Sequence, residues 1–413
     1  MQEKKFYPWL VVGLLWFVAL LNYIDRQMLS TMKPSMMVDI AELQTAANFG
    51  RLMAIFLWIY ALMSPVSGII ADRLNRKWLI VASLFIWSAV TLLMGFAKTF
   101  DQLYVLRAIM GVSEAFYMPA GLSLIADYHQ GKNRSFAVGI HMTGIYLGQA
   151  LGGFGATIAG NFSWQTTFFV FGLVGVAYSF VLILFLKEKK AYTIVTDITD
   201  TIWKKLSDTF RGVGVLLGSL SFWVILFYFS APSLPGWATK NWLPTLLSTN
   251  LNVNMELAGP LSTITIALSA LIGVLVGGVV ADRWIRHTLR GRIYTGAIGL
   301  ALTIPAVLLL GFGDSYLTIL GGASCFGFGF GMFDVNCMPI LCQFASPQHR
   351  ATGYGLMNLA GISSGALITT FLGKSADSGN LSRDIAFLAI FVVLAIFFQL
   401  LLLHPKTANK TDD

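Results

Sequence analysis

Apolar stretches of about 20 residues recur from one end of this 413-residue chain to the other. A helix needs about 20 apolar residues to cross the hydrocarbon core of a bilayer, since each residue adds ~1.5 Å. The stretches therefore predict a membrane protein built from many spanning helices. The twelve predicted spans are residues 7–33, 46–71, 78–98, 101–127, 135–160, 166–186, 216–246, 258–281, 293–312, 315–343, 351–373 and 383–404.

The composition agrees with an all-α polytopic membrane protein. Hydrophobic residues make up 56% of the chain and charged residues 12%, and the mean hydropathy is +0.71. A soluble domain of this length could not bury so much apolar surface. The first apolar run begins near Tyr7 and is too long for the core of a cleavable signal peptide, so we expect it to remain as a span.

Lysine and arginine residues are distributed unevenly between the two sides of the predicted spans. If the N-terminus is cytoplasmic, 20 of the 28 lie on the cytoplasmic side, and Arg26 and Arg107 lie within spans. The positive-inside rule then predicts that both termini face the cytoplasm. The net charge of +8 thus reflects the basic cytoplasmic loops. Binding of nucleic acid would need a clustered basic face, and the sequence shows none. The six basic residues placed outside are Lys33, Arg51, Lys98, Lys240, Lys374 and Arg383.

A repeated sequence divides the chain into halves. GIIADRLNRK (Gly68 to Lys77) ends the second predicted span, and GVVADRWIRH (Gly278 to His287) ends the eighth. Such internal repeats are typical of secondary transporters, whose substrate site lies near the midplane between the halves. The longest polar break separates the two copies. The predicted domains are an N-terminal six-helix bundle (1–186), a cytoplasmic linker (187–215) and a C-terminal six-helix bundle (216–413).

Four ionisable residues lie inside the predicted spans. Asp25 and Arg26 come late in the first span, and Arg107 and Glu114 lie in the fourth. A charge at the centre of a bilayer costs about 3 kcal/mol even on lenient scales. These residues must therefore face a protein interior. There they either line a pathway for an ion or substrate, or form a structural ion pair that locks two helices together.

The positions of these residues along the spans indicate how deep each one lies in the membrane. At ~1.5 Å per residue, Arg26 and Arg107 both lie roughly 10 Å below the outer surface, and Glu114 lies ~10 Å deeper on nearly the same face as Arg107. A guanidinium can hold a carboxylate with two hydrogen bonds and stays charged. A carboxyl group in a dry cavity can take up and release a proton near neutral pH. Tyr23, three residues before Arg26, can offer a hydroxyl group beside it.

The repeated segment also carries a family motif. It matches the G-x-x-x-D-R-x-x-R-K signature, so the chain resembles the major facilitator superfamily over nearly its whole length. The resemblance implies two six-helix bundles around a central cavity that opens alternately to each side. A conformational role at the cytoplasmic gate follows if Asp72 pairs with Arg73 or Arg76 and caps a helix end. The motif residues are Gly68, Asp72, Arg73, Arg76 and Lys77, with a degenerate copy at Gly278, Asp282 and Arg283.

Finer motifs resemble the anion:cation symporter family within that superfamily. They are NYIDR (Asn22 to Arg26), RAIMGVSEAFYMP (Arg107 to Pro119), NWLPTLL (Asn241 to Leu247) and Asn358, with Ser113 where glycine is frequent. The resemblance implies proton-coupled import of an organic anion, foremost a sugar acid such as a hexuronate, aldonate or sialic acid. The implied roles are Arg26 as carboxylate ligand, Asp25 and Glu114 as proton carriers, Arg107 as partner of an acidic residue and Asn358 as ligand of a sugar hydroxyl.

Other polar residues within the spans carry weaker signals. Tyr146 and Gln149, three residues apart, either line the cavity or only bridge helices. Asp334, close to Asn336 in the tenth span, is an intramembrane acid and so a functional candidate. His141 either relays protons or packs through a hydrogen bond. The substrate-binding residues predicted from all these signals are Arg26, Tyr23, Tyr146, Gln149 and Asn358.

Several other functions lack their motifs. The sequence has no Walker-type phosphate loop, metal-ligand cluster or nucleophile elbow, so we expect neither ATP-driven transport, nor a metal or other cofactor, nor an enzyme. Gln149 stands where the antiporter signature of drug exporters has proline, which disfavours drug export.

The sequence therefore predicts a monomeric proton symporter that carries an organic monoanion across a bacterial inner membrane, with protons as the coupling ion. Two alternatives remain. One is a spinster-like transporter of lysolipids or other amphiphiles, which shares an early Asp-Arg pair and a glutamate in the fourth span. Its site should be lined by apolar residues at a lateral opening. The other is a receptor that transports nothing, and it should tolerate a neutral residue at Glu114.

Overall fold

The computed structural model describes residues 3–71, 74–129, 133–189, 212–346 and 349–405. These residues form helices joined by turns, without a strand among them. The helical segments are α1 (Glu3–Leu29), α2 (Lys33–Asp39), η1 (Ala41–Gln44), α3 (Ala46–Ala71), α4 (Arg76–Met94), α5 (Phe100–Glu114), α6 (Tyr117–Tyr128), α7 (Arg134–Gly152), α8 (Gly155–Asn161), α9 (Trp164–Phe185), α11 (Leu220–Leu251), α12 (Met255–Trp284), α13 (Gly291–Phe312), α14 (Tyr316–Phe344), α15 (Arg350–Asp377), α16 (Leu381–Phe387) and α17 (Ala389–Leu402).

Ten helical segments of the described ranges are long and apolar enough to cross a membrane, and they coincide with ten of the predicted spans. One of them, Phe100–Tyr128, joins α5 and α6, and another, Leu381–Leu402, joins α16 and α17. The fifth and seventh predicted spans correspond to α7 with α8 and to α11, which are helical but do not meet the same criterion. Both helices contain polar residues, among them His141 in α7 and Lys240 in α11.

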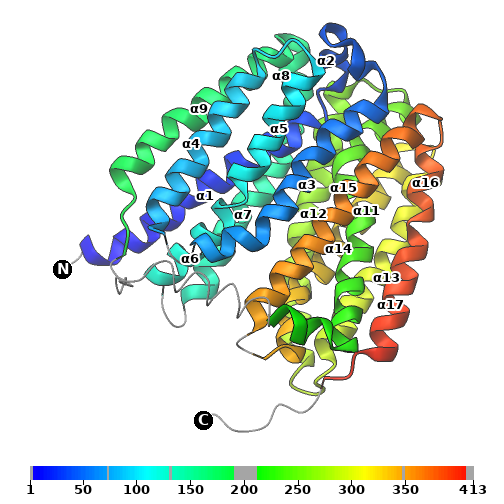
Figure 1. Ribbon diagram of the computed structural model, residues 1–413. Helices are drawn as coiled ribbons and strands as arrows, with labels where there is room; N and C mark the ends of the chain where they lie inside the picture. Colours follow the sequence, from blue (N-terminus) through cyan, green and yellow to red (C-terminus); the bar gives the residue numbers. More distant parts are fainter. Residues whose placement is uncertain (1–2, 72–73, 130–132, 190–211, 347–348, 406–413) are drawn as a thin grey trace.

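The helices form two groups that lie side by side, α1 to α9 and α11 to α17 (Figure 1). In the first group α1 packs on α7 and α4 packs on α9, and in the second α14 packs on both α12 and α13. Glycines make the closest approaches possible. A Cβ atom at Gly148 of α7 would collide with the backbone oxygen of Leu20 in α1. Small residues at such contacts let membrane helices pack backbone against backbone.

The two groups are joined at one end, which we call the seal. There the backbone N–H groups of Ala46 and Ala47, at the start of α3, donate to the two carboxylate oxygens of Asp377 at 2.6 and 2.8 Å. The Thr263 hydroxyl of α12 donates to the backbone oxygen of Ala150 in α7 at 3.0 Å. Among the described residues, hydrogen bonds between the groups occur only at this end and beside the cavity described below. The start of α1 and the end of α17 lie at the opposite end (Figure 1).

Candidate functional site

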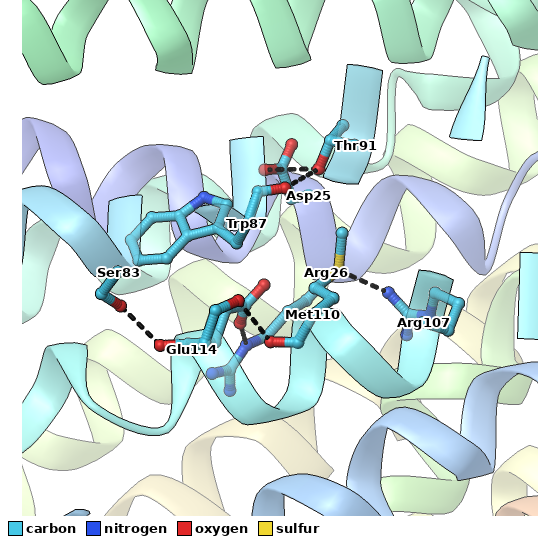
Figure 2. A network of polar contacts seen from close by, with 9 residues as sticks. Asp25, Arg26, Ser83, Trp87, Thr91, Arg107, Met110 and Glu114 are labelled. Atoms are coloured by element: carbon cyan, nitrogen blue, oxygen red, sulfur yellow. Dashed lines mark hydrogen bonds and ion pairs between the residues drawn. The ribbon is translucent and has the colours of Figure 1, made fainter. Parts of the chain in front are cut away.

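A buried salt bridge joins α1 to α5 (Figure 2). Arg26 Nε donates to Glu114 Oε2 at 2.6 Å; the Glu114 side chain is 0% exposed and that of Arg26 12%. Glu114 Oε1 and Arg26 Nη2 are buried and have no hydrogen-bond partner in the described part of the chain. The two charges therefore compensate each other, while one acceptor and one donor stay free for a further partner.

This contact corrects the depth estimate made from the sequence, which placed Glu114 well below Arg26. Counting residues along a span ignores the tilt of the helix and the length of an arginine side chain. In the structure both side chains meet although Arg26 lies in the last turn of α1 and Glu114 at the end of α5. The sequence alone did not pair these two residues.

Aromatic rings surround the Arg26 guanidinium. Its Cζ atom lies 4.5 Å from the ring centre of Tyr60, 4.9 Å from that of Phe56 and 5.1 Å from that of Tyr23. Cation–π contacts of this kind are worth about 0.5–2 kcal/mol, with the larger values where water is excluded. The rings can therefore hold Arg26 in place while its carboxylate partner changes.

Arg107 shares one of these rings but has no carboxylate beside it. Its Cζ lies 4.7 Å from the ring centre of Phe56, and its Nη1 donates to Met110 Sδ at 3.3 Å. Its Nε is buried without a hydrogen-bond partner, and no salt bridge joins it to a described residue. Arg107 thus touches no carboxylate of the described residues, while Glu114 and Asp25 act on it electrostatically without contact.

Asp25 points away from Arg26, into the contact between α1 and α4 (Figure 2). Consecutive residues of a helix differ by about 100° in direction, so neighbours in sequence need not be neighbours in space. Thr91 Oγ1 donates to Asp25 Oδ2 at 3.4 Å, and Asp25 Oδ1 has no hydrogen-bond partner among the described residues. Asp25 is 3% exposed and does not line the cavity below.

A small cavity lies between the two groups of helices. Its volume is about 30 Å³, which holds a water molecule but no sugar acid, so the bound state requires a wider cavity. The N-terminal group supplies most of its wall, and α11 supplies the rest. The lining residues are Tyr23, Arg26, Gln27, Met53, Phe56, Leu57, Arg107, Gln149, Trp237, Lys240 and Asn241.

Of the other four predicted substrate ligands, two line this cavity and two do not. Tyr23 and Gln149 line it, and their role in binding stays a prediction. Tyr146 and Asn358 do not line it. Tyr146 is half-buried on α7, and Asn358 lies on α15 beside Tyr354. In this structure these two residues therefore do not belong to the cavity wall.

The remaining intramembrane candidates differ in their surroundings. Asp334 of α14 is exposed, and it acts electrostatically on groups of both halves, including Tyr23 and Lys240. Asn336 is buried and its amide group donates to the Met332 backbone oxygen of its own helix, at 2.9 Å. His141 is buried, with Nε2 2.8 Å from the Tyr117 hydroxyl. That contact supports the packing role for His141 that the sequence left open beside a proton relay.

Lys240 is the charged cavity residue that the sequence interpretation missed. The positive-inside count places it with the basic residues of the outer side, although residue 240 falls within the predicted span 216–246. In the structure α11 continues to Leu251, and Lys240 lies on the cavity wall. Its backbone oxygen accepts a hydrogen bond from Gln27 Nε2 at 2.8 Å, which ties α11 to α1. A lysine followed directly by the Asn-Trp-Leu-Pro motif was the available signal.

The gating motif is described only in part, since Asp72 and Arg73 lie outside the described residues. Arg76 forms a salt bridge with Asp127 of α6, and the Lys77 Nζ donates to the backbone oxygen of Ile183 at 2.8 Å. A Cβ atom added at Gly68 would meet no atom of the described residues within 4 Å.

The second copy of the motif forms a different contact. Asp282 pairs with Arg292 of α13 at 2.9 Å, and Arg283 is exposed. A Cβ at Gly278 would come no closer than 4.0 Å to another residue, the side chain of Val335. Both copies thus place a salt bridge near the end of the structure where α1 begins, within one group of helices rather than between the groups.

Comparison with known proteins places this geometry in context. A family model described as Major Facilitator Superfamily matches residues 15–370. The hexuronate transporter of Escherichia coli (strain K12) is 24% identical over 99% of this chain and 96% of its own length. The probable galactarate/D-glucarate transporter of Bacillus subtilis (strain 168) is 22% identical over 98% and 93%. Protein spinster homolog 1 of Xenopus tropicalis is 28% identical over 74% of this chain and 61% of its own length.

The fold is shared with a solved transporter structure. A bacterial homolog of the human lysosomal transporter spinster, in an inward-facing and occupied conformation, matches with a TM-score of 0.80 at 20% identity. The match covers 96% of this chain and 97% of the other. At this identity the likeness concerns the arrangement of the helices. The chemistry of the cavity depends on the side chains of this chain.

Proposed function

Because the chain belongs to the major facilitator superfamily, we propose that it is a proton-coupled symporter that brings a sugar acid into the cell. The observation that supports this proposal is the Arg26–Glu114 salt bridge, in which a permanent cation contacts a carboxylate beside the cavity. The proposal includes twelve spans in two six-helix bundles, cytoplasmic termini and residence as a monomer in a bacterial inner membrane. Protons are the coupling ion, and no cofactor takes part.

Coupling follows from competition for Arg26. While Glu114 is ionised, its Oε2 occupies the Arg26 Nε. A proton that adds to Glu114 removes the negative charge, and the guanidinium then needs another anion, because an unpaired buried charge is costly. The carboxylate of the substrate supplies it, with the paired hydrogen bonds that arginine favours. Proton and substrate therefore bind together rather than singly.

Release on the other side reverses these steps. When the cavity opens to the cytoplasm, Glu114 loses its proton to water and regains Arg26, which displaces the substrate carboxylate. Phe56 and Tyr60 hold the guanidinium throughout, because cation–π contacts do not depend on which carboxylate is bound. Arg107 adds positive charge to the same wall, and Tyr23 and Gln149 offer hydroxyl and amide groups to the substrate. Asp25, behind that wall, serves as a second proton acceptor.

An amphiphile transporter is the second candidate, and one observation favours it. Met53, Phe56, Leu57 and Trp237 make part of the cavity wall apolar, as a lipid tail would require. The same cavity carries Arg26, Arg107, Lys240 and several amide groups, so its polar side suits a hydrated polyol acid better.

Transport by purified protein in liposomes separates the two candidates. We expect uptake of a radiolabelled aldonate or hexuronate when the outside is more acidic than the inside, and loss of accumulation when a protonophore is added. The same liposomes should not move a labelled lysolipid between leaflets. Accumulation of the sugar acid without any gradient would contradict proton coupling. Lysolipid movement without sugar-acid uptake would favour the second candidate.

A further inference from the structure

Lys240 is a cavity residue to which the transport cycle above gives no role. It lies on α11, in the C-terminal group of helices, and shares the cavity wall with Arg26 and Asn241. Leu251 ends α11 eleven residues later, which is ~16 Å along a helix. A lysine side chain cannot reach the end of the helix over that distance. Its ammonium group therefore stays at the level of the cavity.

The Lys240 ammonium has aromatic neighbours but no anionic one in contact. Its Nζ lies 5.1 Å from the ring centre of Trp237 and 5.8 Å from that of Phe330. In the described part of the chain it forms neither a hydrogen bond nor a salt bridge. Asp334 attracts it electrostatically from α14 without touching it.

The cations around the cavity thus differ in their partners and lie on two walls. On the N-terminal wall Arg26 holds Glu114, and Arg107 holds no carboxylate. On the C-terminal wall Lys240 has no carboxylate of the described residues in contact, and Asp334 attracts it without touching it. A buried or half-buried cation without an anionic partner is costly, and a bound anion relieves that cost. The cavity is therefore built to receive negative charge from both of its walls.

We propose that Lys240 forms a second anion subsite, and that the preferred substrate is a polyhydroxy dicarboxylate with one acid group at each end. The inference rests on the proposed function, because Arg26 binds the first carboxylate. Lys240 binds the second, and Asn241 and Gln149 are placed to contact the hydroxyl groups between them. A dianion replaces the monoanion that the sequence favoured when Lys240 was placed outside the membrane.

Two ligands that differ only at one end test this subsite. Galactarate and galactonate share a carbon skeleton, but one has a carboxylate where the other has a CH₂OH group. We expect purified wild-type protein to bind galactarate at least ten times more tightly than galactonate in calorimetry. Lys240→Met should weaken galactarate at least tenfold and change galactonate less than threefold. Lys240→Arg should keep the preference, and Lys98→Met, which removes an exposed lysine, should leave both affinities unchanged.

The outcomes separate the possible failures. Equal binding of both acids by the wild type, or preference for galactonate, overturns the second subsite and leaves the proposed function standing. A Lys240→Met protein that loses both acids equally assigns Lys240 to structure, and this also overturns the subsite. Retained galactonate binding by that variant shows that it is folded. If the wild type binds neither these two acids nor a hexuronate, the proposed function fails and the subsite fails with it.

Discussion

Two of the carboxylates that hold helices together in this protein, Glu114 and Asp377, differ in their surroundings. Glu114 is fully buried and takes its hydrogen bond from Arg26 at the cavity. Asp377 is exposed at the seal and takes its hydrogen bonds from two backbone N–H groups at the start of α3. Charge interactions are strong where water is excluded and weak where it is present. Glu114 can therefore control a cycle, whereas Asp377 only adjusts the balance between conformations.

Neutralising Glu114 should produce the largest effect. Glutamine keeps the shape of the protonated acid but cannot release a proton, so Glu114→Gln should abolish accumulation against a gradient while exchange of substrate across the membrane persists. Uptake and counterflow measured in the same liposomes check both halves of this prediction. Glu42→Gln, at an exposed glutamate near the seal, is the matched control and should behave as wild type. Accumulation by Glu114→Gln would transfer the coupling role to Asp25.

The next largest effect should follow from Arg26→Lys. The charge remains, but the planar fork that pairs with a carboxylate is lost. A charge-assisted hydrogen bond is worth about 1.5–3 kcal/mol, so affinity should fall roughly 10- to 100-fold in calorimetry. Arg51→Lys, on the exposed side of α3, should not change affinity. An unaltered dissociation constant for Arg26→Lys would remove Arg26 as the carboxylate ligand.

Neutralising the other carboxylate should matter much less. Asp377→Asn weakens an exposed contact with a helix N-terminus, worth about 0.3–1 kcal/mol, which shifts the population opened at the seal roughly two- to fivefold. Distances between spin labels at Glu42 and Ser378 would record that shift. Asp314→Asn, at an exposed aspartate of a loop, serves as control. A change as large as that of Glu114→Gln would show that the two carboxylates do not differ as described.

The smallest effect on binding is expected at Asp25. Because Asp25 faces Thr91 rather than the cavity, Asp25→Asn should change substrate affinity by less than about threefold, a difference below ~0.7 kcal/mol. Transport should slow, since a proton acceptor is lost. Calorimetry and initial uptake rates on one preparation measure the two quantities. A large loss of affinity would place Asp25 in the binding site after all.

Sequence patterns anticipated the helices better than the contacts. Long apolar runs identified ten of the observed membrane-length segments, because hydropathy depends on composition alone. Charges inside those runs drew attention to α1 and α5, which the Arg26–Glu114 salt bridge joins. Their pairing depended on helix tilt and rotamers, which a linear count omits. For that reason Asp25 and Arg26, adjacent in sequence, face different neighbours.

Lys240 is a second residue whose surroundings the sequence pattern did not predict. The helix α11 contains three prolines and runs past the predicted span, and the positive-inside count places its Lys240 on the outer side of the membrane. The roles of Tyr146 and Asn358 stay predictions, since neither lines the cavity in the arrangement described. Their contribution depends on the shape of the wider cavity that a sugar acid requires.

Exchange of Glu114 for a substrate carboxylate at Arg26 is the central step of the proposed cycle, and proton uptake on binding tests it most directly. Calorimetric titrations of one sugar acid in two buffers of different ionisation enthalpy give the number of protons bound with each substrate molecule. In a pH range where Glu114 is ionised in the free protein, we predict uptake of close to one proton by the wild type and close to none by Glu114→Gln. Binding to the wild type without proton uptake in that range would contradict the account.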